Sequence, residues 1–469
     1  MDAALFKVEF SEAFESLKTA ISNADKKVLA IVGCAVGSYA AYQALEYLSM
    51  SGKSNNTLLI QMHDKVRGFY NSGYLMKLRH FYYDPSAFVV NYGSYGVLPK
   101  PVLEFKRKLQ VEMELCPDEW FFLKLREKWD KSCQELADAV GCNVHNIAYV
   151  HNVTDAINSV IRSTPLGFTD AVLITNHTYG AIKNTVDYYT SKGGARIVVL
   201  DIPFPIKDEE SICDLYRKII NKNPDIKLAI IDHITSSSAL IMPIKKLVKI
   251  CKKHGILTLI DGAHAPGQLA LEIEKIDADF YAGNLHKWHY APRGCGFIWA
   301  KTEFLSTLDP SLVSHNYNKG FQDKFYKQGT DDYTNYLAGG YAVSQYYPSI
   351  GGLEHLYQTM VPMRQWAAQH FRKMWGTESP TIPSTMQAPY MEIVKMPEAI
   401  ISYYGVTPQG AEECKVTLMK EYNVYMMVSA VNDALWCRVS CQIFSTKKEY
   451  YRAAQAVMDL ESIITGKVN

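Results

Sequence analysis

Short apolar runs alternate with helical segments between positions 146 and 300 of the 469-residue chain. The runs are IAYVH, AVLIT, RIVVL, LAIIDH, ILTLID, DFYAG and GFIWA. Uninterrupted apolar runs of this length are typical of parallel strands that helices cover on both faces. The pattern predicts an α/β fold in which helices wrap a large, mostly parallel sheet.

One helix of this region combines an apolar stripe with a strongly charged face. Pro243 opens it, apolar residues recur at positions 244, 247, 248 and 251, and Gly255 closes it. The remaining positions include five lysines, at 245, 246, 249, 252 and 253. We interpret these lysines as a solvated helix face rather than a basic docking patch.

The pattern changes after about residue 304, where glycine and tyrosine become more frequent. Helical periodicity from about Ser349 leads to two short apolar runs, YMEIV and LWCRVSC, which predict a smaller C-terminal α+β domain. We place the large domain at 57–345, with 57–100 also contributing to the small domain, and the small domain at 346–469.

Residues 1–56 are expected to form an N-terminal tail that contains one long apolar run. Segment 28–48, VLAIVGCAVGSYAAYQALEYL, has no charge before Glu46 and is long enough to cross a bilayer. Its glycines and alanines lower its hydrophobicity, so a buried or surface helix is the alternative to a membrane anchor.

Charge and cysteine content narrow the choice of partners. Lysine and arginine number 49 against 48 acidic residues, so the chain lacks the basic excess with which proteins bind nucleic acid. The ten cysteines form no CxxC pair and none lies at zinc-type spacing from a histidine. We therefore expect no metal and a reducing, cytosolic environment.

Two residues at the ends of predicted strands, Asp261 and Lys287, indicate the chemistry. Ligands of a parallel sheet collect at the carboxyl ends of its strands, where these side chains can meet. A lysine amine condenses with an aldehyde, and an aspartate keeps a pyridine nitrogen protonated. Either residue alone is compatible with a capping or surface role, but the pair predicts pyridoxal 5'-phosphate attached to Lys287 as a Schiff base.

A candidate phosphate site lies upstream, where the run IAYVH passes into NVTDAINSVI. Val153 and Thr154 fall at the start of the predicted helix, and a helix N-terminus binds anions. A plain helix cap is the alternative interpretation of this segment.

Six motifs occur in order between Asn91 and Phe444: NYGSYG, NVTDAIN, HTYGAI, DGAHAPG, GNLHKW and RVSCQIF. Through them the chain resembles the class V branch of fold-type I pyridoxal-phosphate enzymes, in particular the isopenicillin N epimerase-like group within the cysteine desulfurase superfamily. The resemblance implies a large sheet domain that binds the cofactor and a smaller C-terminal domain.

The resemblance also implies roles for individual residues on the cofactor side. Lys287 would hold the cofactor and Asp261 would pair with the pyridine nitrogen. His264 would lie near the phenolic oxygen, while Asn284 and His286 would join Thr154 and Val153 around the phosphate.

On the substrate side, the resemblance implies that Tyr179 covers the cofactor ring, with His177 as the less favoured candidate. Arg438 would grip the α-carboxylate of the substrate with its planar, two-pronged donor set. Asn91 and Ser94, in the NYGSYG segment, would line the same side.

The segment QGTDDYTNYLAG resembles a loop in which a threonine, here Thr330, reaches the phosphate held by a partner subunit. This implies a homodimer. Asp331 stands where relatives commonly have an arginine, and this reversal of charge puts the type of substrate in doubt.

The reaction expected first is a carbon-sulfur β-lyase reaction on cysteine or a cysteine S-conjugate or sulfoxide. Amino-acid epimerisation is the alternative. Persulfide transfer is disfavoured because it needs a thiolate nucleophile, and no cysteine lies between Cys295 and Cys414. A catalytically silent, membrane-tethered scaffold is disfavoured because it has no physical need for Lys287, Asp261 and Arg438.

Two glycosylation sequons bear on the location of the catalytic domain. Asn152-Val-Thr lies in the predicted phosphate site and Asn176-His-Thr lies beside Tyr179, where a glycan would block the cofactor. We therefore expect a cytoplasmic protein, or a membrane-anchored one whose catalytic domain faces the cytosol.

Overall fold

A computed structural model describes residues 73–466 of the chain. The chain divides into two compact units, Met1–Met76 and Lys77–Asn469, and the boundary falls within α4 (Gly73–His80). The predicted tail 1–56, with its apolar run 28–48, lies outside the described residues. Within 73–466, no helix is long and apolar enough to cross a membrane.

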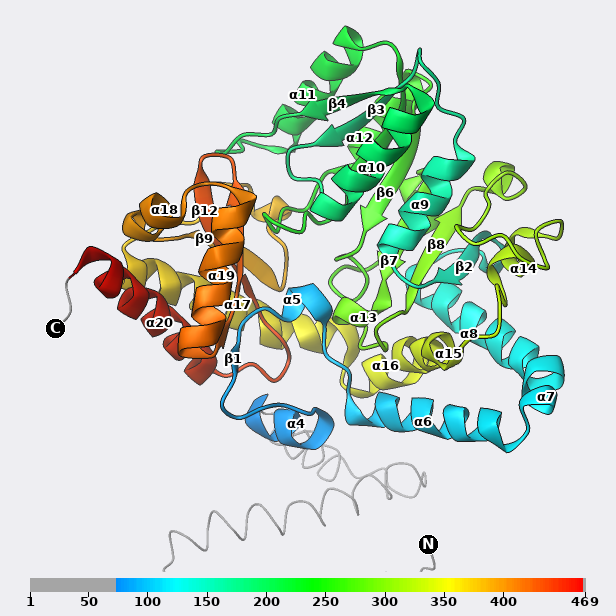
Figure 1. The fold of residues 1–469 in the computed structure, drawn as a ribbon, viewed down its shortest axis with the longest axis horizontal. Coiled ribbons are helices and arrows are strands. Elements are labelled where there is room, and N and C mark those ends of the chain that lie inside the picture. The colour runs from blue at the N-terminus through cyan, green and yellow to red at the C-terminus, as the bar shows by residue number, and fades with distance from the viewer. Residues whose placement is uncertain (1–72, 467–469) are drawn as a thin grey trace, which may run out of the picture. The chain divides into compact units, whose positions relative to one another are not determined.

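A seven-stranded sheet forms the larger part of the second unit (Figure 1). Its strands are β2 (Ile147–Val150), β3 (Ala171–Thr175), β4 (Arg196–Leu200), β5 (Ile226–Asp232), β6 (Leu257–Gly262), β7 (Phe280–Asn284) and β8 (Gly296–Ala300). The order is β2-β8-β7-β6-β5-β3-β4; β3 to β7 pair in parallel, and β8 runs antiparallel to both neighbours. The seven predicted strands and the mostly parallel sheet are confirmed.

Helices between the strands cover the sheet, as predicted. They are α9 (Val153–Ser163), α10 (Gly180–Gly193), α11 (Glu209–Lys222) and α12 (Ile244–Lys253). Ile157 and Val160 of α9 pack with Val186 of α10 on the fully buried Leu228 and Leu259 of the sheet. This core fixes the start of α9 at the carboxyl edge of the strands.

The lysine face of α12 is largely as predicted. Its apolar residues Leu247, Val248 and Cys251 are fully buried. Four of the five lysines are exposed, but Lys252 is half-buried and forms an ion pair with Asp277.

Further helices complete the second unit. They are α5 (Tyr92–Tyr95), α6 (Lys100–Leu115), α7 (Pro117–Glu119), a π-helical turn at Trp120–Lys124, α8 (Leu125–Val140), α13 (Leu285–Trp288), α14 (Phe321–Phe325), α15 (Thr334–Tyr341), a second π-helical turn at Ala342–Tyr346 and α16 (Tyr347–Ser349). Short 3₁₀ turns occur at Val144–Asn146, Ile273–Ile276, Thr302–Phe304 and Ser384–Met386. The proposed boundary between 345 and 346 falls within the second π-helical turn and stays a prediction.

A three-stranded antiparallel sheet lies in the C-terminal part of the chain, drawn in orange in Figure 1. Its order is β11 (Met427–Val431), β12 (Ala434–Ser440) and β9 (Met391–Lys395), and α17 (Gly352–Trp375), α18 (Glu398–Tyr404), α19 (Pro408–Tyr422) and α20 (Lys447–Thr465) surround it. The predicted runs YMEIV and LWCRVSC overlap β9 and β12 to within one residue at each end, whereas β11 was not predicted. A separate pair, β1 (Phe88–Val89) with β10 (Val424–Tyr425), brings the segment before α5 next to this sheet.

Candidate active site

A small cavity lies at the carboxyl ends of β5, β6 and β7. Seven residues predicted from the sequence line it, namely Val153, Thr154, Tyr179, Asp261, His264, Asn284 and Lys287. The wall also includes Ile182, Asp232, Ile234, Ser236 and Ala263. The structure therefore brings most of the predicted site residues together.

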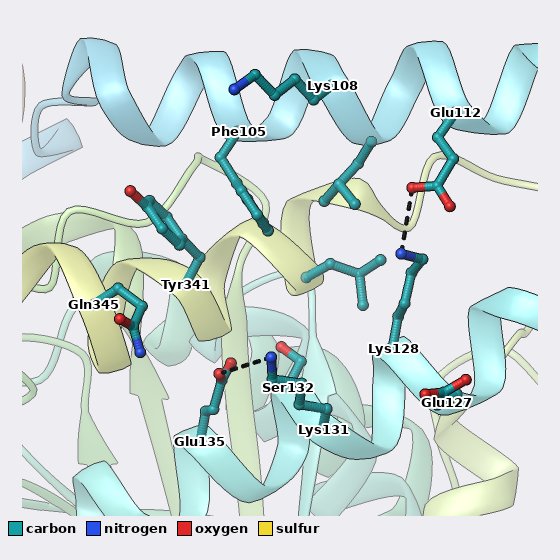
Figure 2. A pocket seen from close by; sticks show the side chains of 12 residues that line it. Phe105, Lys108, Glu112, Glu127, Lys128, Lys131, Ser132, Glu135, Tyr341 and Gln345 are labelled. Atoms are coloured by element: carbon teal, nitrogen blue, oxygen red, sulfur yellow. Dashed lines mark ion pairs between the residues drawn. The ribbon is translucent and has the colours of Figure 1, made fainter. Parts of the chain in front are cut away.

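A larger groove of about 1110 Å³ lies between α6, α8 and α15 (Figure 2). Four of its charged side chains form pairs, since Lys128 lies 3.2 Å from Glu112 and Lys131 lies 4.0 Å from Glu135. Its buried hydroxyl, Ser132, is hydrogen-bonded to Tyr149 and to the carbonyl of Tyr336, and its lining includes no buried lysine, arginine or carboxylate of the kind found around Lys287. We therefore assign the chemistry to the smaller cavity.

The amine of Lys287 is prepared to act as a nucleophile. Its Nζ lies 3.0 Å from His264 Nε2, and Trp288 Nε1 donates to His264 Nδ1 at 3.4 Å. The indole therefore leaves the imidazole proton on Nε2, which donates to the neutral amine. Burial, then the positive charge of Arg438, lowers the pKa of Lys287 to about 7, while Asp261 opposes the shift. Near neutral pH much of the lysine is an unprotonated amine.

His264 supports this protonation state because burial and the nearby charges of Lys287 and Arg438 hold its pKa well below the ordinary value. The imidazole therefore stays neutral. It can orient the lysine amine by a hydrogen bond without adding a second positive charge.

Asp261 provides a buried carboxylate at the end of β6. The backbone N–H of Ala263 donates to its Oδ1 at 2.9 Å. Burial raises the pKa of Asp261, and this backbone bond and the charge of Lys287 oppose the shift. Asp232, the last residue of β5, is the register partner of Asp261 and was not predicted. The sequence feature that could have identified it is an aspartate late in the apolar run LAIIDH, in the same way that Asp261 ends ILTLID.

The start of α9 is arranged as an anion site. Asn152 caps the helix by accepting from the backbone N–H of Asp155 at 3.1 Å, and Val153 N–H donates to Asn284 Oδ1 at 3.0 Å. Thr154 lines the cavity between them. Val153 and Asn284 thus fix the turn, and Thr154 is the residue best placed to face a phosphate.

His286 and Thr330 do not line the cavity. The Nδ1 of His286 is buried without a hydrogen-bond partner among the described residues, and burial lowers the pKa of this imidazole to about 4. Thr330 is exposed, and the neighbouring Asp331 lies 3.8 Å from His151 Nε2. Their roles toward the phosphate stay predictions.

The geometry favours Tyr179 over His177 as the residue above the ring. The buried His177 donates from Nε2 to the carbonyl of Ile202 and accepts at Nδ1 from Ser238, each at 2.9 Å. Tyr179 precedes α10, lines the cavity and is 50% exposed. Its ring is therefore available to a ligand, whereas the imidazole of His177 is engaged.

Arg438 is a buried cation without a carboxylate partner among the described residues. Its Nη1 donates to the carbonyl of Ser236 at 2.7 Å, and its Nη2 donates to Asn91 Oδ1 at 3.1 Å and Ser94 Oγ at 3.0 Å. The buried Nε has no hydrogen-bond partner within residues 73–466. Burial lowers its pKa to about 10, so it stays charged at neutral pH. A desolvated charge of this kind requires an anion, and a substrate carboxylate fits.

Gly96 allows the segment with Asn91 and Ser94 to approach the helix of Lys287. Its φ is +61°, and a Cβ at this position would lie 1.8 Å from the carbonyl oxygen of His286. Only glycine avoids that overlap. The close approach joins the substrate side of the site to α13.

These features fit pyridoxal phosphate. The cavity combines a reactive lysine amine, a buried carboxylate for the pyridine nitrogen and a helix N-terminus for the phosphate. The guanidinium of Arg438 is not part of the cavity wall, but it donates a hydrogen bond to the carbonyl of Ser236, which lines the cavity.

Comparisons with known proteins identify relatives of the chain. The chain is 26% identical to the probable chloroplastic L-cysteine desulfhydrase of Arabidopsis thaliana, over 81% of this chain and 84% of the relative. It is 29% identical to isopenicillin N epimerase of Streptomyces clavuligerus, over 50% of this chain and 58% of the relative. The fold resembles that of the cystine C-S lyase C-DES, solved with glycine covalently linked to its pyridoxal phosphate; the TM-score is 0.66 and the identity 18%, over 80% and 97% of the two chains.

The family model of class-V aminotransferases matches residues 124–374, more than half of the chain. This match and the shared fold confirm the predicted fold type and pyridoxal phosphate as the cofactor. The chain belongs to the class-V aminotransferase family.

Proposed function

We propose that the protein is a pyridoxal-phosphate-dependent carbon-sulfur lyase acting on cysteine or on a cysteine S-conjugate or sulfoxide. For cysteine, the substrate and one water give pyruvate, ammonia and hydrogen sulfide. One observation supports this above all: a lysine amine with a pKa of about 7 shares the site with a buried guanidinium that has no carboxylate partner among the described residues.

The guanidinium orients the substrate. Arg438 would bind the α-carboxylate in two-pronged fashion, and Asn91 and Ser94 keep its fork in place. The substrate's α-carbon is then held on the side of the cavity where Lys287 lies. Because the guanidinium is buried, water competes poorly for the carboxylate.

Lys287 moves the protons. Bound pyridoxal phosphate supplies the electron sink for the charge that develops at the α-carbon. The neutral amine of Lys287, once it leaves the hydrogen bond from His264, is positioned to remove the α-proton. The resulting ammonium can pass that proton to the sulfur as the carbon-sulfur bond breaks.

Epimerisation is the alternative reaction, supported by the relatives named isopenicillin N epimerase. It would need a second group to reprotonate the α-carbon from the opposite face, where Tyr179 is the candidate. The relatives named cysteine desulfhydrase, which cover more of the chain, favour the lyase reaction. A scaffold without catalysis does not explain a buried, uncompensated Arg438 beside a reactive lysine.

The experiment that tests the proposal follows pyruvate release from a panel of amino acids. Cysteine-derived substrates should give one pyruvate per substrate consumed, and recovered substrate should stay largely L. D-enantiomer without pyruvate would establish the epimerase instead. No turnover of any amino acid by cofactor-loaded protein would count against both.

The protein is further proposed to be a homodimer in which Thr330 reaches the partner's phosphate. Thr330 is exposed in the single chain and lies in the loop before α15, and both features support this role. Sedimentation should give twice the chain mass, and Thr330→Ala should weaken cofactor binding without changing that mass.

The catalytic unit is also proposed to face the cytosol, with 28–48 as a membrane anchor. Both sequon asparagines are engaged inside the protein: Asn152 caps α9, while Asn176 donates to Asp201 at 2.7 Å and accepts from Ile202 N–H at 3.0 Å. A glycan on the Nδ2 of either residue would stand next to the cavity wall, at Val153 and Thr154 in one case and near Tyr179 in the other. Membrane fractionation with protease protection tests the topology, and a glycosidase-sensitive mass would contradict it.

A further inference from the structure

Asp232 and Asp261 form a buried pair of carboxyl groups. They are register partners on the parallel strands β5 and β6, so their side chains leave the same face of the sheet, and adjacent strands lie about 4.8 Å apart. Both line the cavity that contains Lys287, and they are 4% and 5% exposed. Only Asp261 has a role implied by the resemblance.

Two carboxylates in such a site cannot both be ionised, because each charge is desolvated and repels the other. Burial first, and then the charge of Asp261, holds the pKa of Asp232 well above its ordinary value. Asp261 has the better hydrogen bond, since Ala263 N–H donates to it at 2.9 Å, whereas the hydroxyl of Thr178 lies 3.5 Å from Asp232. The single negative charge of the pair therefore belongs on Asp261.

The other groups around Asp232 agree with a neutral acid. The hydroxyl of Thr178 lies 3.5 Å from its Oδ2, a weak contact for a buried charge. Lys183 of α10 is the cation that favours its ionised form, but its Nζ donates to the carbonyl of Asn176 at 2.7 Å. Tyr216 of α11 faces it with a phenol, which has no charge to offer.

We propose that Asp232 is a positioning residue that remains a neutral carboxylic acid and thereby keeps the negative charge of the pair on Asp261. This inference rests on the proposed function, since it assigns Asp261 to the pyridine nitrogen. An uncharged partner fills the space beside Asp261 without attracting water or repelling its charge. A neutral acid at position 232 also leaves Asp261 as the one anion of the pair that faces the cofactor.

The first test is infrared spectroscopy of the cofactor-loaded enzyme at neutral pH. The carbonyl stretch of a protonated carboxylic acid should be present in the native enzyme and absent from Asp232→Asn. Asp279→Asn is the matched control, because Asp279 is also buried in this sheet but lies at the opposite end, bonded to Thr258 N–H at 2.7 Å. A band that survives in Asp232→Asn would overturn the proposal.

The second test is cofactor affinity, measured by titrating cofactor-free protein with pyridoxal phosphate. Asp232→Ala should weaken binding about tenfold, since it leaves a gap beside Asp261, and Asp232→Asn should recover most of that loss because the amide is neutral and of the same shape. If Asp232→Asn binds as weakly as Asp261→Asn, the charge lies on Asp232 and the proposal is wrong. Neither test uses a substrate, so failure here is distinct from failure to release pyruvate.

A third measurement follows unfolding temperature against pH. A carboxyl with a raised native pKa retains its proton when the unfolded chain has lost it, so it lowers stability as pH rises above about 4. Asp232→Asn should therefore lose less thermal stability than the native enzyme between acidic and neutral pH. An unchanged slope would contradict a neutral Asp232.

Discussion

The cofactor side and the substrate side of the site are built in different ways. The cofactor side comes from neighbouring strands of one sheet, where Asp261 and Lys287 are brought together by parallel pairing of β6 and β7. The substrate side is assembled from Asn91, Ser236 and Arg438, three distant segments joined by side-chain hydrogen bonds. The cofactor side is fixed by backbone geometry. The substrate side is centred on the buried charge of Arg438, which has no counter-ion among the described residues until an anion binds.

Removing the reactive amine should have the largest effect. Lys287→Ala should lower kcat by about 1,000-fold or more, because both covalent attachment and proton transfer are lost. Borohydride should no longer fix the cofactor to the protein, as measured by mass spectrometry. Lys249→Ala, at an exposed lysine of α12, is the control. A reducible adduct at normal yield in Lys287→Ala would falsify the assignment.

Removing the guanidinium should mainly affect the substrate. Arg438→Ala should lower kcat/KM about 100-fold, since a desolvated charge-assisted contact contributes about 2 to 4 kcal/mol, while cofactor content changes little. Arg452→Ala is the matched control, because Arg452 is on the small-sheet side of the chain but partly exposed, 3.4 Å from Asp459. If cofactor content fell as far as kcat/KM, Arg438 would also contribute to cofactor binding, and the proposed division between a cofactor side and a substrate side would be wrong.

The lowered pKa of Lys287 predicts how fast cofactor-free protein takes up pyridoxal phosphate. Its neutral amine predominates above about pH 7, so the rate should be nearly constant there and fall about tenfold per pH unit below. Stopped-flow absorbance measures this rate. A rate that keeps rising toward pH 10 would mean that the amine has the ordinary lysine pKa.

The smallest effect concerns the free energy of unfolding. Arg438→Met should lower kcat/KM about as much as Arg438→Ala but raise stability by about 1 kcal/mol, because it removes a buried charge that has no counter-ion among the described residues. Chemical denaturation without ligand measures the difference. A less stable variant would show that the bonds to Asn91, Ser94 and Ser236 outweigh the desolvation of the charge.

The same contrast explains what could be predicted from the sequence. Each strand of the large sheet is a continuous apolar run, so all seven were predicted, and the cofactor residues at their ends followed. β11, with sequence MVSAV, was missed because a serine interrupts its apolar run, and the two-residue β1 and β10 have no pattern to detect. The contact of Asn91 with Arg438 could be implied only by resemblance, since no local periodicity links distant segments.

Asp232 was missed for another reason. It ends an apolar run, as Asp261 does, but an aspartate after a strand is also an ordinary turn residue. Its significance depends on the register of β5 against β6, which sequence alone does not specify. For Lys252 the prediction itself was wrong. This lysine was predicted to face water, but it forms an ion pair with Asp277, a residue that is distant in the sequence and adjacent in the fold.

The parallel pairing of β1 with β10 has a consequence for synthesis on the ribosome. Phe88 and Val89 pair with Val424 and Tyr425, and Asn91 meets Arg438 across 347 positions of sequence. At roughly 5 to 20 residues per second, the early segment waits about 20 to 70 seconds for its partners to be translated. The nascent chain can therefore complete its large sheet and cofactor side before the substrate side exists, and synthesis of the segment with Arg438 is the event that makes the enzyme able to recognise an amino acid.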